Sequence, residues 1–109
     1  NKKLASMDME ERYRLIISTI LNAIGCQVEV EHMLSTGRID IVASTSRFIY
    51  VVELKLSNNG GINAAEKQII DNGYLKPFLA DDRKVIGLAV ELDDMGKGLI
   101  DWKEVQNKQ

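Results

Sequence analysis

The first regular pattern in the chain has the period of a helix. Over residues 8–24, apolar residues recur at steps of three and four, which places them on one face of an α-helix. The stripe is made of Tyr13, Ile16, Ile17, Ile20 and Ile24. Asp8, Glu10 and Glu11 fall in the first turns, where negative charge suits the helix dipole. Gly25 is placed to end the helix as a C-terminal cap. The pattern predicts a helix that buries this stripe.

The next part of the chain has strand character. Residues 27–31 alternate between apolar and polar, as in a half-exposed strand. Turn residues at 35–37 lead into a second strand over 38–42. After a short polar turn, residues 48–56 give the strongest strand signal, rich in β-branched and aromatic residues and apolar on both faces. That composition is typical of a central strand covered on both sides.

The remaining elements follow a clear break at residues 58–61, which read Asn-Asn-Gly-Gly. A second helix is expected over 64–75, ahead of Pro77. Residues 84–92 predict a fourth strand, and residues 100–105 an edge strand or a helical turn, with Trp102 packing this end onto the body. The order is therefore helix, three strands, helix, strand, which is an α/β fold in one domain over residues 1–109.

Length and composition narrow the class of protein. The 109 residues suffice for one core, and 45% hydrophobic with 28% charged residues is an ordinary globular balance. No apolar run is long enough to span a bilayer and no secretory leader opens the chain, so we expect a cytoplasmic protein without membrane attachment. The chain begins with Asn1, which suggests a fragment of a longer protein. The net charge of −2 argues against nucleic-acid binding through bulk charge, although a local basic rim is compatible with it.

Candidate chemistry lies in the central strands. Glu53 and Lys55 alternate with apolar residues and so point to the same face of their strand. Asp40 stands between two isoleucines in the preceding strand. If these strands form an antiparallel hairpin, Asp40 and Glu53 lie near each other across the ladder. Two adjacent carboxylates repel unless one is protonated or a cation lies between them. A structural ion pair near a strand end is the plainer alternative for Glu53 and Lys55.

The ligand types available favour a hard metal ion. Cys26 is the only cysteine and His32 the only histidine, which leaves no zinc site built on paired thiolates. Two carboxylates and the main-chain carbonyl of Leu54, completed by water, suit Mg²⁺ or Mn²⁺. Lys55 would then lie beside the metal, where it can orient a water or meet the charge of a phosphate.

These residues resemble a known family. The runs Gly37-Arg38-Ile39-Asp40 and Val52-Glu53-Leu54-Lys55, followed by Gln68-Ile69 and Gly73-Tyr74, are similar to the PD-(D/E)xK nuclease superfamily. The chain is closest to the branch found as the C-terminal domain of bacterial AAA-ATPase-like proteins. The resemblance implies a restriction-endonuclease-like αβββαβ core with a central mixed sheet flanked by helices. It departs from the family's name in one respect, because Ile39 stands where a proline is expected.

The resemblance also implies residue roles. Asp40, Glu53 and the Leu54 carbonyl would bind Mg²⁺ or Mn²⁺, and Lys55 would orient the attacking water or stabilise the transition state. Gln68 would lie over the site. Either Glu10 or Glu11 would complete the pocket, and Glu10 is favoured because it extends the Tyr13 side of the helix. For the substrate, Arg38 and Tyr74 are the expected contacts.

The function expected from these residues is hydrolysis of nucleic-acid phosphodiester bonds, with DNA the favoured substrate. The resemblance also implies an N-terminal ATPase-like domain in the parent chain. Two alternatives stay open. One is a catalytically silent binding module on the same fold, attached to an AAA-type ATPase. The other is an oligomerisation domain, such as a homodimer, with a self-complementary apolar patch and no metal affinity.

Overall fold

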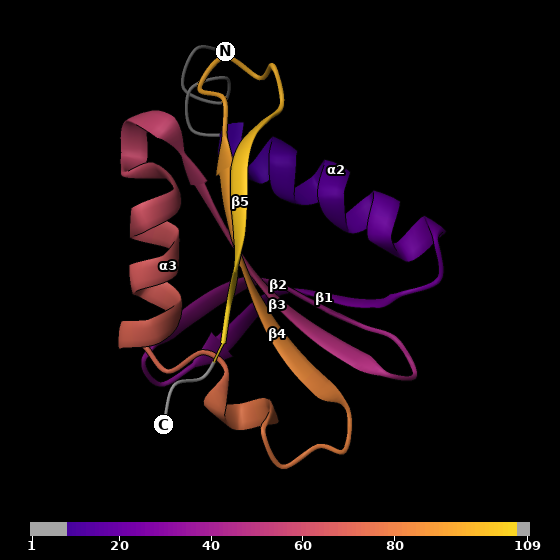
Figure 1. Ribbon diagram of the computed structural model, residues 1–109. Coiled ribbons are helices and arrows are strands. Elements are labelled where there is room, and N and C mark those ends of the chain that lie inside the picture. The colour runs from indigo at the N-terminus through magenta and orange to yellow at the C-terminus, as the bar shows by residue number, and fades with distance from the viewer. Residues whose placement is uncertain (1–8, 107–109) are drawn as a thin grey trace.

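The computed structural model describes residues 9–106, and the predicted α/β class is confirmed (Figure 1). Its elements in chain order are α2 (Met9–Ala23), β1 (Gln27–Leu34), β2 (Gly37–Ser44), β3 (Phe48–Leu56), α3 (Gly61–Asp71), β4 (Lys84–Leu92) and β5 (Leu99–Val105). Two short 3-10 turns, Ser57–Asn59 and Lys76–Phe78, flank α3. Within the described residues, no helix is long and apolar enough to cross a membrane.

One mixed sheet organises the chain. Its five strands lie in the order β1-β2-β3-β4-β5, and every neighbouring pair is antiparallel except β3 and β4, which are parallel. The parallel pair is joined by α3, as a crossover connection requires. Side chains of β3 alternate between two cores, with Val51 in the core beneath α3 and Val52 in the core beneath α2. The helices therefore cover opposite faces of a central β3, as predicted.

Element boundaries follow the sequence closely for the strands and less closely for α3. The predicted ranges 48–56 and 84–92 match β3 and β4. The second helix begins at Gly61 and ends at Asp71, several residues earlier than predicted at both ends. The helix can begin early because Gly60, with φ of 96°, turns the chain directly into it. The segment at 100–105 is the edge-strand alternative, since β5 pairs with β4 over residues 101–105 and again at Leu99, with a bulge at Ile100.

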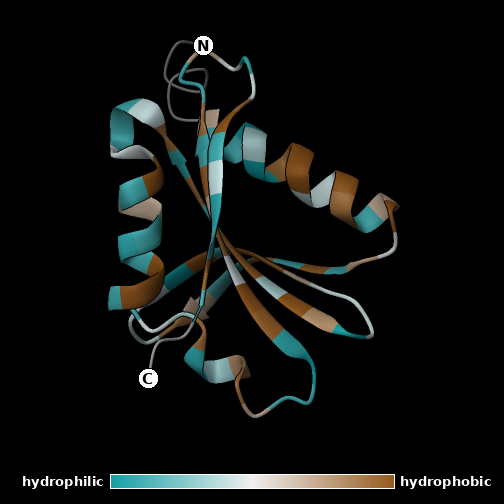
Figure 2. Cartoon of the chain, viewed as in Figure 1, coloured by the Kyte–Doolittle hydropathy of each residue, from teal (hydrophilic) through white to brown (hydrophobic). Residues whose placement is uncertain are grey.

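The predicted buried stripe of the first helix is partly wrong. Ile16, Ile20 and Ile24 are 54%, 54% and 72% exposed, and Figure 2 shows apolar residues along the visible surface of α2. The helix is rotated so that Tyr13 is buried while Arg14 and Ser18 take buried positions as well. The reason is tertiary, because the Arg14 guanidinium is drawn inward by two carboxylates of β1 and β2. Asp8 lies outside the described residues.

The predicted end of the helix is confirmed. Gly25 has a φ of +107° and its N–H donates to the carbonyl of Asn22, while the N–H of Cys26 donates to the carbonyl of Leu21. These two bonds form a Schellman motif, which satisfies the last carbonyls of the helix and turns the chain into β1.

At the other end of the chain, the expectation for Trp102 is wrong. The indole is 55% exposed on β5, since this strand forms an outer edge of the sheet.

Candidate active site

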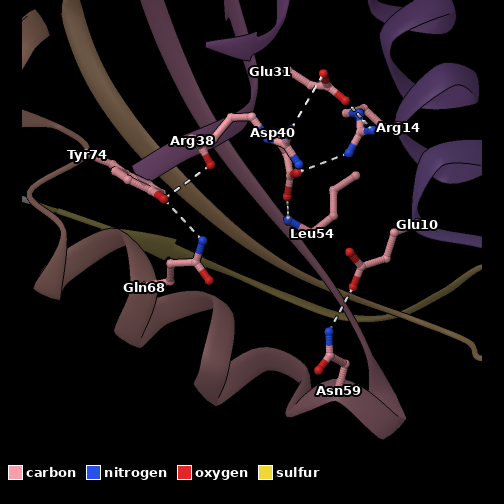
Figure 3. Close-up of polar contacts among 9 residues, drawn as sticks. All are labelled: Glu10, Arg14, Glu31, Arg38, Asp40, Leu54, Asn59, Gln68 and Tyr74. Carbon is pink, nitrogen blue, oxygen red and sulfur yellow. Dashed lines mark hydrogen bonds and ion pairs between the residues drawn. The ribbon is translucent and has the colours of Figure 1, made fainter. Parts of the chain in front are cut away.

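The structure brings Asp40 and Glu53 together across the β2–β3 hairpin. The ladder pairs Ile41 with Val52. Continued by one residue, the same antiparallel register sets Asp40 opposite Glu53. Beyond Ile41 and Val52, a side chain replaces a main-chain acceptor: the Leu54 N–H donates to Asp40 Oδ2 over 2.8 Å. Both acids are buried, at 9% and 3% exposed. The hairpin expected from the sequence therefore forms, with two carboxylates at its open end. Figure 3 shows Asp40 with its contacts to Leu54 and Arg14.

Lys55 lies on the same side of β3 as Glu53. Val52 and Leu54 belong to the core beneath α2, so the alternating residues Glu53 and Lys55 face the side of the sheet that α3 covers. Lys55 is half-buried. Its ammonium favours the ionised form of both acids, since it lowers their pKa values, although it is not the largest influence on either.

Burial dominates the electrostatics of the two acids. The pKa of Glu53 is raised to about 8, chiefly by desolvation and next by the neighbouring Asp40 carboxylate, while Lys55 and the Asp40 N–H lower it. Desolvation also raises the pKa of Asp40, against the lowering effects of the Leu54 N–H and Arg14. Burial thus outweighs the effect of the nearby cations, so Glu53 carries a proton at neutral pH in the absence of another cation.

One atom of the pair has no hydrogen-bond partner among residues 9–106. Glu53 Oε1 is fully buried and makes no hydrogen bond in the structure, a costly state for a carboxylate oxygen. An oxygen donor of this kind, beside a second carboxylate, fits a hard divalent cation. Among residues 9–106, no three His, Cys, Asp or Glu side chains are grouped to hold a metal, so two carboxylates, a main-chain carbonyl and water are the donor set that fits.

Sequence analysis missed Arg14, which forms the densest polar contacts near the site. Its guanidinium lies 3.3 Å from Asp40 Oδ1 and 2.6 Å from Glu31 Oε1, with Arg38 a further 3.8 Å from the other Glu31 oxygen. Glu31 has a φ of 55°, which is unfavourable for a residue with a side chain. A signal for Arg14 exists in the sequence, because it stands four residues after Glu10 on one helix face. The backbone of Glu31 has no such signal.

Between the two candidate glutamates of the first helix, the structure turns Glu10 toward the site. Its negative charge raises the pKa of both Asp40 and Glu53, and its Oε1 accepts a hydrogen bond of 3.2 Å from Asn59. Glu11 is exposed and lines a surface groove with Arg12. Asn59, in the turn after β3, is a second residue that sequence analysis left without a role.

Gln68 and Tyr74 act on the start of β2. The Tyr74 hydroxyl donates to the carbonyl of Arg38 at 3.1 Å and accepts from Gln68 Nε2 at 3.1 Å. Figure 3 shows Gln68 turned toward Tyr74, at a distance along the sheet from Asp40. Tyr74 is fully buried, whereas the Arg38 side chain is 53% exposed. Contact of Arg38 and Tyr74 with substrate stays a prediction, as does the place of Gln68 over the metal.

Comparison with known protein families decides the class of this arrangement. A family model described as the PD-(D/E)XK nuclease superfamily matches residues 8–102. The chain belongs to the PD-(D/E)XK nuclease superfamily. Asp40, Glu53 and Lys55 lie within the matched range, on the adjacent strands β2 and β3. A search among curated proteins gave no match.

Proposed function

We propose that this PD-(D/E)XK domain hydrolyses phosphodiester bonds of nucleic acid with Mg²⁺ or Mn²⁺ at Asp40 and Glu53. The observation that carries the proposal is Glu53 Oε1, which is buried beside a second carboxylate and has no hydrogen-bond partner among residues 9–106. Burial, and after it the charge of Asp40, raises the Glu53 pKa to about 8. A divalent cation removes both costs at once, since it supplies a partner for the oxygen and neutralises the repulsion. A purely structural ion pair would leave this oxygen unexplained.

Each residue then has a distinct task. Asp40, Glu53 and the carbonyl of Leu54 hold the metal, which when bound lowers the pKa of water and polarises a phosphate oxygen. Lys55 supplies a positive charge on the same face of β3, where negative charge develops on the phosphate. Glu10 adds a carboxylate from α2, held by Asn59. Gln68 and Tyr74 hold the entry to β2, and Arg38 can reach a phosphate outside the site.

The partners follow from the same chemistry. We propose DNA as the substrate and an N-terminal ATPase-like domain as a neighbour in the parent chain, which the resemblance to one branch of the superfamily supports. A net charge of −2 means that DNA would be bound by local cations and the metal, with little help from overall charge.

A cleavage assay tests the proposal. Single- and double-stranded DNA, and RNA as a third substrate, are incubated with the protein in Mg²⁺, in Mn²⁺ and in EDTA. We expect cleavage with metal only, and a loss of about 100-fold or more in Asp40→Asn and Lys55→Ala, the scale seen when a transition-state contact is removed. Calorimetry with Mn²⁺ should show binding to the parent and to Lys55→Ala but not to Asp40→Asn.

Matched variants separate the site from general effects. Asp82→Asn and Lys97→Ala change the same residue types at exposed positions and should keep full activity. Cleavage that survives Asp40→Asn would point to a contaminating nuclease. Equal Mn²⁺ binding by the parent and Asp40→Asn would show that the metal site is assigned wrongly.

A second function is supported by one contact. Arg14 lies against Asp40 Oδ1 and so compensates part of the charge that a metal would otherwise neutralise. This favours a silent nuclease-fold module that binds DNA or an ATPase partner without turnover. The same assay distinguishes the two, because the module predicts DNA binding that needs no metal and yields no product.

A further inference from the structure

The strand β5 exposes an unusual amount of apolar surface at the edge of the sheet. It is last in the strand order, so its outer side pairs with no other strand of residues 9–106. Leu99, Ile100 and Trp102 are 60%, 54% and 55% exposed. Figure 1 shows β5 running along the open side of the molecule between α3 and α2. Exposed apolar residues on an unpaired edge are a template for association with another chain.

The outward main-chain groups of β5 can be identified. Trp102 faces Val90 of β4 in the register, yet the Trp102 N–H donates to the Asp101 side chain over 2.8 Å. This N–H therefore points away from β4. Because hydrogen-bonding directions alternate along an antiparallel strand, the N–H and C=O groups of Glu104 point outward as well. A register shift between Glu91 and Leu92 leaves Ile100 without a partner in β4, so the alternation does not extend to Ile100.

We propose that two copies of this chain pair antiparallel through β5, about a twofold axis at Trp102. In this register, Trp102 faces Trp102 of the second copy. The outward N–H and C=O of Trp102 in each strand meet those of the other, as hydrogen bonding requires. The two sheets become one of ten strands, and the interface is isologous.

Charge selects this register among those that hydrogen bonding allows. A twofold axis at Trp102 sets Asp101 of each copy opposite Lys103 of the other, which gives two attractive pairs. A shift of the axis to Glu104 would set two glutamates face to face, and a shift to Ile100 would leave Asp101 without a lysine. In the single chain, Lys103 binds Glu66 over 2.8 Å on an exposed surface, so it can bridge both acids in the dimer.

The opposite edge of the sheet is unsuited to the same pairing. The φ of 55° at Glu31 interrupts the extended backbone of β1 near its middle. A kink of this kind breaks the line of outward groups, which is one way in which proteins protect an edge strand. Among the described strands, only β5 combines an unpaired edge, exposed apolar residues and complementary charges, and its residues 101–105 pair regularly with β4.

Sedimentation velocity over a range of concentrations tests the proposal on the whole chain. Because a seven-residue edge is short, we expect a dimer with a Kd on the order of 10 µM. Trp102→Lys should be monomeric at about 100 µM, where most of the parent is paired. Met33→Lys is the matched control, since Met33 is 70% exposed on β1, and it should dimerise like the parent. Thermal melts of both variants establish that they fold.

A charge exchange makes the register itself testable. Asp101→Lys sets two lysine pairs at the interface and Lys103→Asp sets two aspartate pairs, so each variant should be monomeric alone. Their mixture restores both attractive pairs and should form a heterodimer. The proposal is overturned if the parent stays monomeric at every concentration tested. It is equally overturned by a dimer that persists in Trp102→Lys, or by variants that do not associate when mixed.

Discussion

Arg14 and Asp40 join the first helix to the second strand through a contact of 3.3 Å between Nη1 and Oδ1, inside the protein. The same guanidinium reaches Glu31 at 2.6 Å, so one cation serves two acids on two strands. Glu53, by comparison, contacts no arginine in the described part of the chain and keeps one oxygen there without a hydrogen-bond partner. The two acids of the site are therefore unequal, with Asp40 partly neutralised by the protein and Glu53 left to a proton or a metal.

Replacement of Arg14 by Met should separate its structural and chemical effects. Without the guanidinium, Asp40 and Glu31 lose their cation, and the free energy of unfolding in EDTA should fall by about 3 kcal/mol. If Asp40 binds Mn²⁺, affinity for the ion should rise several-fold, because a competing positive charge is gone. Urea denaturation and calorimetry measure the two effects. Arg12→Met, at an exposed position of the same helix, should change neither.

The raised pKa of Glu53 predicts a dependence of stability on pH. The pKa is about 8 in the folded chain against an ordinary 4.5, so the folded state holds this proton more tightly than the unfolded state. The resulting stabilisation is fully present below about pH 4.5 and is lost as the pH rises toward 8. Without metal, the loss should be on the order of 5 kcal/mol.

Glu53→Gln should remove most of this dependence, since the amide cannot titrate. We expect the variant to match the parent near pH 5 and to exceed its free energy of unfolding at pH 9, as measured by urea denaturation in EDTA. Glu91→Gln is the control, because hydrogen bonds from Ser57 and Ile62 lower the Glu91 pKa and its titration falls below this range. Parallel pH profiles for parent and Glu53→Gln would contradict the burial effect.

Tyr74→Phe should affect the site from a distance. The change removes a hydroxyl that donates to the Arg38 carbonyl and accepts from Gln68, so buried polar groups lose their partner. The expected cost is about 1–2 kcal/mol in unfolding free energy. Cleavage should decline in kcat, because Arg38 lies two residues before Asp40. Tyr50→Phe, on a ring stacked against Phe48, should leave kcat unchanged.

The rotation of α2 can be checked by truncation of isoleucines. Ile20 is 54% exposed and Ile69 is 1% exposed. Ile20→Ala should therefore change the unfolding free energy by less than about 1 kcal/mol, whereas Ile69→Ala should lower it by about 2–5 kcal/mol. Equal losses, measured by urea denaturation, would mean that the predicted stripe of the first helix is buried after all.

The sequence alone determined the order of elements and the pairing of the two acids. Residues 48–56 are apolar on both faces, and the strong β-propensity of this run is a local property that the chain keeps in the fold. Period-two alternation then places Glu53 and Lys55 on one face whatever the surroundings. A short turn between residues 44 and 48 makes the β2–β3 hairpin and, with it, the approach of Asp40 to Glu53.

Tertiary structure decided the rest. The rotation of α2 depends on which side chains the sheet accepts, and a salt bridge to Glu31 and Asp40 outweighs an apolar stripe that periodicity alone would bury. The partners of Gln68 and Tyr74, the kink at Glu31 and the exposure of Trp102 depend likewise on residues far apart in the chain. Local periodicity predicts helices and strands because it depends on neighbouring residues. The burial of a charged side chain depends on the partners that residues distant in the sequence supply.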